Sequence, residues 1–417
     1  MMTWSKHWWM ALALWGAMGA SAEAQRNRVR PNDPSTCPYT EGDPEVMAAA
    51  GIVSLGGFEF GNSDTAQVDE FLATADIRWI ETEHFEIGIG LPTYRIPQRE
   101  KNKIRTELTW LQEVLPEVNP KTRQLDPWLR AHLYAQRAER AYARFLEIVQ
   151  LEQDVFPEPD TTWLLGTPYW GEGPHLGQNG KFEILILPSE ALHVSYLRQE
   201  FGLSIRKTQR WNVVERDTLT VAIHDDDGSL TRDTAMHGHV VFNLAHNFLD
   251  GLKHYSYDTP IWVHEGLAHF LEREVSPRYN SFDSSEGGIA EETRKSKWHK
   301  ETRSLVRGGD APRMASMMSL RNYAELELDH HFATWSMVRF LVEQHPEQFA
   351  LFLQSIKGWK NDEGIADGSN MPQKHRDSFR EHFGWNYAQF DTAWQEWVMA
   401  TEEEPPDDAF PLPGSDD

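Results

Sequence analysis

The sequence predicts an α+β fold in which a small mixed sheet precedes a largely helical C-terminal part. Apolar runs with the length and pattern of strands occur at residues 77–89, 181–188 and 217–224. Further along the chain the apolar residues recur at helical spacing. Helices are expected there over residues 234–250, 330–344, 346–356, 376–383 and 387–399.

The first 24 residues have the pattern of a secretory signal peptide. Lys6 lies in a short n-region, residues 10–20 form an apolar h-region, and residues 22–24 read A-E-A, which matches an A-x-A cleavage site before Gln25. The apolar run is too short to cross a bilayer comfortably. We therefore expect an exported protein, periplasmic or secreted, whose mature chain has no transmembrane segment.

Residues 25–75 are expected to form an N-terminal arm. Its first part, residues 25–61, is rich in Pro, Gly and polar residues, which predicts a loosely held segment. The alternating pattern of residues 77–89 then indicates the first strand. Two helices are expected over residues 98–115 and 127–151, and the apolar side chains of the second have the spacing of a core-facing helix.

A loop rich in Gly, Pro and aromatic residues is expected over residues 161–180. Trp163, Tyr169 and Trp170 could stack on sugar rings, which favours a glycan- or cell-wall-binding role for the 163–170 segment. Aromatic residues of this kind more often fill a core. Both interpretations remain open at this point.

Composition excludes several classes of function and site. The formal net charge of −24 argues against nucleic acid or an anionic membrane as the main partner. Cys37 is the only cysteine, so neither an internal disulfide nor a cysteine-based zinc site can form. Residues 401–417 contain many acids, several prolines and no basic residue, which predicts a disordered acidic tail.

The most informative stretch covers residues 231–275 and contains two helical segments, HVVFNLAH and WVHEGLAH. The second is expected to begin after Pro260, with Thr259 as its N-cap. His264 and His269 are five residues apart, roughly 140° around a helix, so they cannot both face one metal ion. Glu265 and His269 are four apart and can do so.

The sequence I-W-V-H-E-G-L-A at residues 261–268 resembles a motif of the gluzincin metallopeptidases, the thermolysin and alanyl aminopeptidase type. In that family the glutamate of this motif is the third protein ligand of the zinc ion. The gap of 18 residues between His246 and Glu265 is the usual one in the aminopeptidase branch. Residues 81–87 and 383–398 resemble parts of bacterial exported peptidase-MA-like domains. The resemblance implies a zincin-like subdomain at residues 76–275, which carries the site helices, and a helical C-terminal subdomain at residues 276–400.

The same resemblance places the zinc signature H-E-x-x-H on residues 242–246, where two positions are replaced. Phe242 stands at the first ligand position and has no lone pair to offer. Asn243 stands at the general-base position and cannot accept a proton from a bound water. His246 and Glu265 remain as metal residues, with His269 as an additional candidate. Because catalytic zinc normally takes three protein ligands, zinc binding is expected to be weak, and no other cofactor is indicated.

Four further residues are expected to line the cleft: Phe242, His239, His264 and Phe332. In the family a tyrosine often stands where Phe332 is found, and its hydroxyl is a candidate for stabilising an oxyanion. No residue is therefore assigned a catalytic role with this sequence.

Three functions compete at the level of sequence. The first is a non-catalytic pseudopeptidase that binds a peptide, a protein or another ligand. The second is an active zinc metallohydrolase with rearranged ligands, and the third is a glycan- or wall-binding module. Metal content distinguishes the first two, and glycan binding tests the third.

Overall fold

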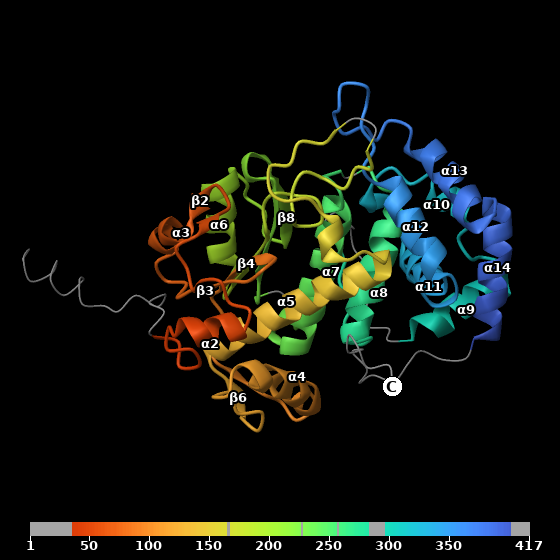
Figure 1. Cartoon of the computed structure of the whole chain (residues 1–417). Helices are drawn as coiled ribbons and strands as arrows, with labels where there is room; N and C mark the ends of the chain where they lie inside the picture. Colours follow the sequence, from red (N-terminus) through yellow and green to blue (C-terminus); the bar gives the residue numbers. More distant parts are fainter. Residues whose placement is uncertain (1–35, 165–166, 227, 257, 283–296, 402–417) are drawn as a thin grey trace, which may run out of the picture.

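The computed structural model describes residues 36–164, 167–226, 228–256, 258–282 and 297–401. Its main sheet has five strands in the order β3-β4-β7-β9-β8, in which β4, β7 and β9 are parallel and the two edge strands are antiparallel to their neighbours. The predicted combination of a small mixed sheet with a helical C-terminal part is confirmed (Figure 1). The strands are β3 (Arg78–Glu81), β4 (Phe85–Ile89), β7 (Phe182–Leu187), β8 (Gln209–Val213) and β9 (Thr218–His224).

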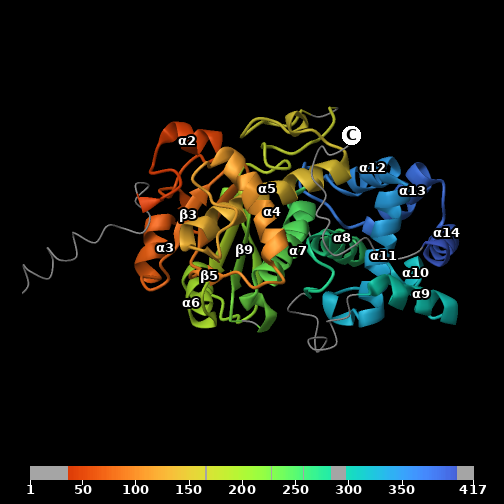
Figure 2. The same cartoon turned by 90° about the horizontal axis from the view of Figure 1, so that it is seen from below.

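Helices cover both faces of the sheet, as the burial of the central strand β7 indicates. All of its residues are buried, as expected for a parallel strand between two helical layers. Ile184 and Ile186 pack into the cluster that contains residues of α5 (Pro127–Val149) and α7 (Asp233–Gly251). Leu185 and Leu187 point to the opposite face, toward α3 (Thr65–Phe71) and α6 (Glu190–Phe201). Figure 2 shows the sheet between these two layers.

The predicted helices are present, with shifts of a few residues at their ends. The helix expected at 376–383 begins earlier, at Met371. The prediction of Thr259 as an N-cap is wrong: Pro260 occupies the cap position, and the Thr259 hydroxyl has no hydrogen-bond partner among the described residues. The remaining helices are α4 (Lys101–Val114), α8 (Ile261–Val275), α9 (Trp298–Gly308), α10 (Met314–Met317), α11 (Leu328–Gln344), α12 (Pro346–Ile356), α13 (Met371–Phe383) and α14 (Tyr387–Ala400).

Two strand predictions need correction. Residues 77–89 form a hairpin of β3 and β4 instead of one strand, because the chain turns at residues 82–84. Glu139 of α5 holds this turn: its carboxylate lies 2.5 Å from the Thr82 hydroxyl and 2.7 Å from His84 Nδ1. The edge strand β8 was not predicted, and its burial is only partial, so it lacks the apolar run that identified β7 and β9.

The prediction that residues 25–61 are loosely held is wrong for their described part, residues 36–61, because the chain from residue 36 to residue 75 is folded. This segment forms α2 (Pro44–Ala49), β1 (Glu59–Phe60), β2 (Ser63–Asp64) and α3. Phe60 and Val68 are fully buried against the outer face of the sheet, and Cys37 is a buried free thiol 3.1 Å from His132 Nε2. Another two-stranded sheet joins β5 (Tyr94–Arg95) to β6 (Gln124–Leu125).

The C-terminal helices share one apolar core with the sheet. A single cluster of buried residues includes the inner face of the sheet, α7, α8 and the helices from α11 to α14. The predicted subdomains 76–275 and 276–400 are therefore packed together. Within the described residues, no helix has both the length and the apolar content needed to cross a bilayer.

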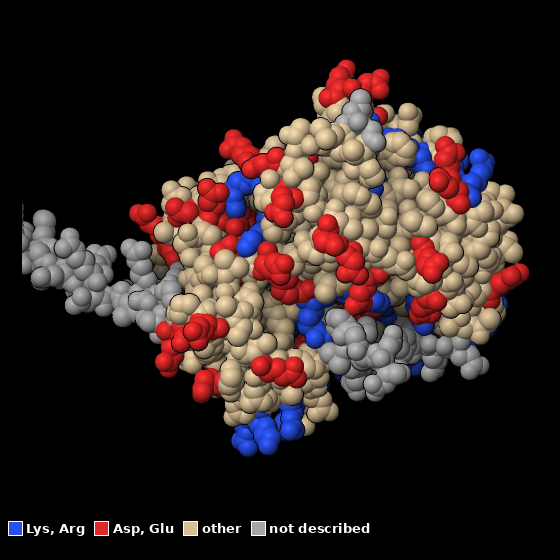
Figure 3. All heavy atoms as spheres, in the orientation of Figure 1, with Lys and Arg blue, Asp and Glu red and all other residues tan. Residues whose placement is uncertain are grey.

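Two predicted terminal segments fall outside the described residues: the signal peptide, and the acidic tail beyond Thr401. Thr401 itself is described, and its carbonyl oxygen lies 2.9 Å from His299 Nε2. Acidic side chains are spread over the face shown in Figure 3, with basic side chains in smaller groups between them.

His375 connects α8 to the C-terminal helices. The Trp262 indole donates to His375 Nε2 at 3.1 Å, and His375 Nδ1 lies 2.7 Å from the Tyr387 hydroxyl. Because an indole nitrogen can only donate, His375 Nε2 must be unprotonated. Burial, with a smaller contribution from Arg376, lowers the pKa of His375 to about 3.

We expect His375 to make the native state sensitive to acid. Between pH 6.5 and about 3 the unfolded chain binds a proton at His375 that the folded chain does not. This residue therefore reduces the free energy of unfolding by up to about 1.4 kcal/mol for each pH unit below 6.5. Urea unfolding at pH 7, 6, 5 and 4 should show the wild type losing stability relative to His375→Gln as the pH falls. Parallel curves for the two proteins would contradict this prediction.

Candidate functional site

The candidate site lies where three helices meet. His246 is on α7, Glu265 and His269 are on α8, and His331 is on α11. Gly266 permits the close approach of α8 to α11, because a Cβ atom at this position would lie 2.5 Å from the Thr334 carbonyl oxygen. The glycine of the E-G-L-A phrase thus has a packing function.

The carboxylate of Glu265 is the centre of the cluster. Its Oε1 atom lies 3.3 Å from His246 Nε2, and its Oε2 atom lies 3.4 Å from both His269 Nε2 and His331 Nδ1. His269 Nε2 and His331 Nδ1 are 3.0 Å apart. Glu265, His269 and His331 are all fully buried, and their ligand atoms lie within 4.8 Å of one another, which is close enough to bind one metal ion.

A second set of polar residues supports the cluster on the side of His269. Glu272 Oε2 lies 3.3 Å from His269 Nδ1, and its other oxygen accepts a hydrogen bond from Ser281. The Ser281 hydroxyl lies 2.9 Å from His239 Nδ1, and His239 Nε2 lies 2.7 Å from the Thr208 hydroxyl. These contacts connect the buried cluster to the start of the edge strand β8.

The positions of the protons follow from burial and charge. Burial raises the pKa of Glu265, but the proximity of His246, His269 and His331 holds it well below its usual range. Burial lowers the pKa of His269, yet the carboxylates of Glu265 and Glu272 bring it above its usual value. Burial lowers the pKa of His331 despite its contact with Glu265. His269 is therefore easier to protonate than His331.

Phe242 and Asn243 have roles in packing and hydrogen bonding. The Phe242 ring centroid lies 4.9 Å from that of His246 and 5.1 Å from that of His269, and the side chain is buried. Asn243 Nδ2 donates to the His239 carbonyl oxygen at 2.8 Å, and its Oδ1 accepts from Arg210 Nη1 at 2.9 Å. Phe242 therefore occupies the space beside His246 and His269. Both the nitrogen and the oxygen of the Asn243 amide already have hydrogen-bond partners.

The two remaining predicted site residues, His264 and Phe332, lie in different surroundings. His264 stacks on His246 with ring centroids 5.5 Å apart, and its Nε2 atom lies 3.4 Å from Asp250 Oδ1. Phe332 packs against Trp298, with ring centroids 5.1 Å apart, and its place in a cleft stays a prediction. The neighbouring His331 points to Glu265 instead. The sequence analysis did not identify His331 as a site residue, because it lies 62 residues beyond His269 along the chain.

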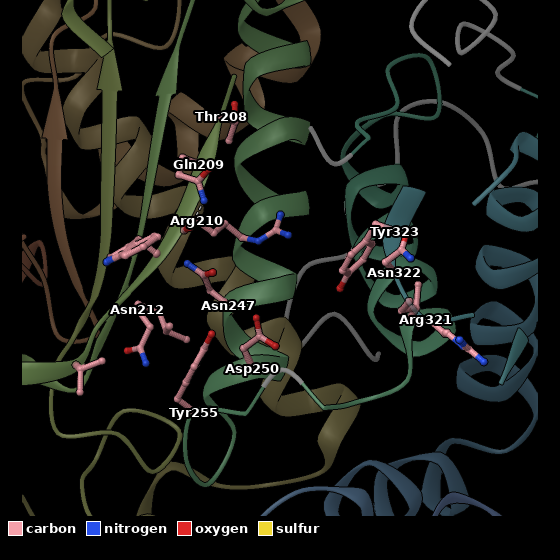
Figure 4. A pocket seen from close by; sticks show the side chains of 14 residues that line it. Thr208, Gln209, Arg210, Asn212, Asn247, Asp250, Tyr255, Arg321, Asn322 and Tyr323 are labelled. Atoms are coloured by element: carbon pink, nitrogen blue, oxygen red, sulfur yellow. Dashed lines mark hydrogen bonds between the residues drawn. The ribbon is translucent and has the colours of Figure 1, made fainter. Parts of the chain in front are cut away.

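A pocket of about 640 Å³ lies beside the cluster, between β8 and a 3₁₀ turn that begins at Tyr323. Figure 4 shows Gln209 and Arg210 on β8, Asn247 and Asp250 on α7, and the 321–323 segment on the opposite side. The Tyr323 ring centroid lies 6.0 Å from that of His246. Tyr323, rather than Phe332, brings a hydroxyl-bearing ring close to the predicted site, and sequence spacing gave no signal for it.

The partly buried Asp250 lies at the α7 end of the pocket, with Lys357 next to it. Burial raises the pKa of Asp250 to about 6, although Lys357 and Arg210 act in the opposite direction. Lys357 Nζ donates to the carbonyl oxygens of Asp250 and Ser256 at 2.9 Å each, and burial lowers its pKa to about 8. Asp250 can therefore change its charge at mildly acidic pH.

The rings of the 163–170 segment have lysine neighbours. Lys360 Nζ lies 4.0 Å from the Tyr169 ring centroid and 5.9 Å from that of Trp163. Lys253 Nζ lies 4.5 Å from the ring centroid of Trp170. A sugar that stacked on these faces would have to displace the lysines.

Comparison with known proteins adds one similarity. A family described as "Protein of unknown function (DUF1570)" matches residues 233–360 of the chain. The matched region contains His246, Glu265, His269 and His331. No curated protein matches the chain.

We expect Gly266→Ala to destabilise the protein by about 1–3 kcal/mol, because the added methyl group meets the backbone of α11. Gly238→Ala in α7 is the matched control: its Cβ atom would lie 3.4 Å from Glu272 Cγ, an ordinary contact. Alanine also has the higher helix propensity, by about 1 kcal/mol. Chemical denaturation should therefore show opposite signs for the two variants, and equal effects would contradict the close packing of α8 and α11.

Proposed function

We propose that this chain is an exported, non-catalytic relative of the gluzincin metallopeptidases that binds an extended peptide in the pocket beside β8. One observation carries this proposal. β8 is the end strand of the sheet, so its main-chain groups pair with β9 on one side only among the described strands, and four of its residues line the pocket. An extended peptide can add to such an edge as a further strand. Export rests on the N-terminal pattern, and sequencing of the mature protein, expected to begin at Gln25, tests it.

The side chains around the pocket suit a peptide ligand. Asn212, Asn247 and Asn322 offer amide donors and acceptors for a peptide main chain. Trp211 is 39% exposed and provides an apolar surface for a ligand side chain. Ligand sites commonly combine apolar surface with a few polar groups that set the orientation of the ligand.

Two replacements argue against hydrolysis in this pocket. Loss of a general base alone commonly reduces a rate by about 10²–10⁴-fold, and Asn243 cannot take that role. Phe242 removes a ligand from the family position and fills the space beside His246. The alternative of a metallohydrolase with rearranged ligands has less support, because Glu265, His269 and His331 are fully buried and do not line the pocket. The glycan alternative has less support because lysines lie over the rings of the 163–170 segment.

The peptide-binding proposal predicts a difference between two exposed tryptophans. Trp211 lines the pocket and is 39% exposed, whereas Trp359 is 42% exposed and is not among the pocket residues. Heptapeptides selected from a random display library should bind the wild type in calorimetry. Trp211→Ala should weaken this binding at least about tenfold, equivalent to about 1.4 kcal/mol, and Trp359→Ala should leave it unchanged. Failure to select any peptide, or equal loss in both variants, would refute the proposal.

The proposal that the protein is non-catalytic predicts that the wild type does not cleave peptides. Fluorogenic casein and the selected heptapeptides should show no turnover above that of buffer, with or without added zinc, because Asn243 cannot activate a water molecule. Chelator treatment should then change nothing. Chelator-sensitive hydrolysis that disappears in His246→Gln would show that the chain is an enzyme.

A further inference from the structure

The Glu265 carboxylate is in an unusual state for a buried charge. The side chain is fully buried, and neither of its oxygens accepts a hydrogen bond of good geometry from the described residues. Three imidazole nitrogens, from His246, His269 and His331, surround it at 3.3–3.4 Å. Buried charges are normally paired and hydrogen-bonded, or they coordinate a metal.

The three donor atoms have the spacing of a metal-binding face. Glu265 Oε2, His269 Nε2 and His331 Nδ1 are separated by 3.4, 3.4 and 3.0 Å. Zinc takes nitrogen and oxygen ligands at about 2.0–2.1 Å, which in a tetrahedron places neighbouring donors about 3.3 Å apart. Little movement of the side chains is therefore needed to receive an ion.

The neighbours of His269 favour the tautomer that a metal requires. Glu272 Oε2 lies 3.3 Å from His269 Nδ1, so a proton on Nδ1 faces a carboxylate and Nε2 is left to bind. Metal-bound histidines commonly have such a carboxylate at their second nitrogen. Ser281 in turn donates a hydrogen bond to the other oxygen of Glu272, which holds this carboxylate in place.

We propose that Glu265, His269 and His331 bind a divalent ion of the zinc class that joins α8 to α11. Two imidazoles and one carboxylate suit zinc, cobalt or nickel better than magnesium or calcium, which prefer oxygen ligands throughout. The site differs from the gluzincin position, because His331 of α11 replaces the ligands expected from α7. It does not depend on the proposed binding of peptides.

The surroundings indicate a structural ion. The rings of Phe282 and Trp298 lie against His269, with centroids 5.5 and 4.7 Å away, and Phe282 also lies 4.8 Å from His331. None of the three ligands lines the pocket. An ion held by these three buried ligands would compensate the charge of Glu265 and hold the two helices together.

Metal analysis of the full chain, expressed without a histidine tag, tests the proposal. After dialysis against zinc and then metal-free buffer, mass spectrometry should find about one zinc per chain, the stoichiometry of a single mononuclear site. His331→Gln and His269→Gln should weaken zinc binding at least about tenfold through loss of a ligand. The control His264→Gln removes another buried histidine next to Glu265 and should retain the metal, and magnesium should not replace zinc.

Two further measurements keep the test decisive if a glutamine variant folds poorly. Zinc should raise the Tm of the wild type, and a chelator should reverse the shift. His331→Cys keeps a zinc ligand, so its cobalt complex should gain a sulfur-to-cobalt absorption band that the wild-type complex lacks. Absence of zinc from the wild type would overturn the proposal. Loss of zinc in His246→Gln with retention in His331→Gln would do so as well, since it would place the ion at the family position.

Discussion

The arrangement of the central helices depends on the burial of one carboxylate. Glu265 is fully buried, and histidine nitrogens from α7, α8 and α11 lie 3.3–3.4 Å from its carboxylate. A charge in a low-dielectric interior is costly unless its partners are held close, so the positions of the three helices are coupled. Gly266 makes this coupling possible, because any larger residue would separate α8 from α11.

Phe242 and Asn243 on α7 contribute to packing and hydrogen bonding between the buried cluster and the sheet edge. Phe242 fills the space beside His246 and His269 with an aromatic ring. Asn243 connects Arg210 of the edge strand to the backbone of α7. Phe242 thus contributes packing, and the hydrogen bond from Arg210 to Asn243 holds a side chain that lines the pocket.

The pocket and the buried cluster are neighbours with different properties. The stacked rings of His246 and His264 lie near both, since His246 contacts Glu265 and His264 lies beside Asp250. The pocket is lined by polar and apolar side chains and reaches the edge of the sheet, whereas the cluster is buried and packs against the rings of Trp298 and Phe282. Glu265, His269 and His331 do not line the pocket, so the proposed peptide site and the proposed metal site are separate.

The sequence alone determined the local structure and part of the site. Apolar runs located β7 and β9, helical periodicity located α5 and α7, and four-residue spacing predicted that Glu265 and His269 share one face of α8. These features are encoded by neighbouring residues, because the 3.6-residue helical repeat decides which side chains point the same way.

Only the tertiary structure decided which helix completes the cluster. His331 lies 62 residues beyond His269, and the periodicity of α11 shows which face is buried but not what it is buried against. The same limit explains the missed strand β8 and the N-terminal segment that was expected to be loose. Their positions depend on packing against distant parts of the chain, and a pattern of neighbouring residues does not contain that information.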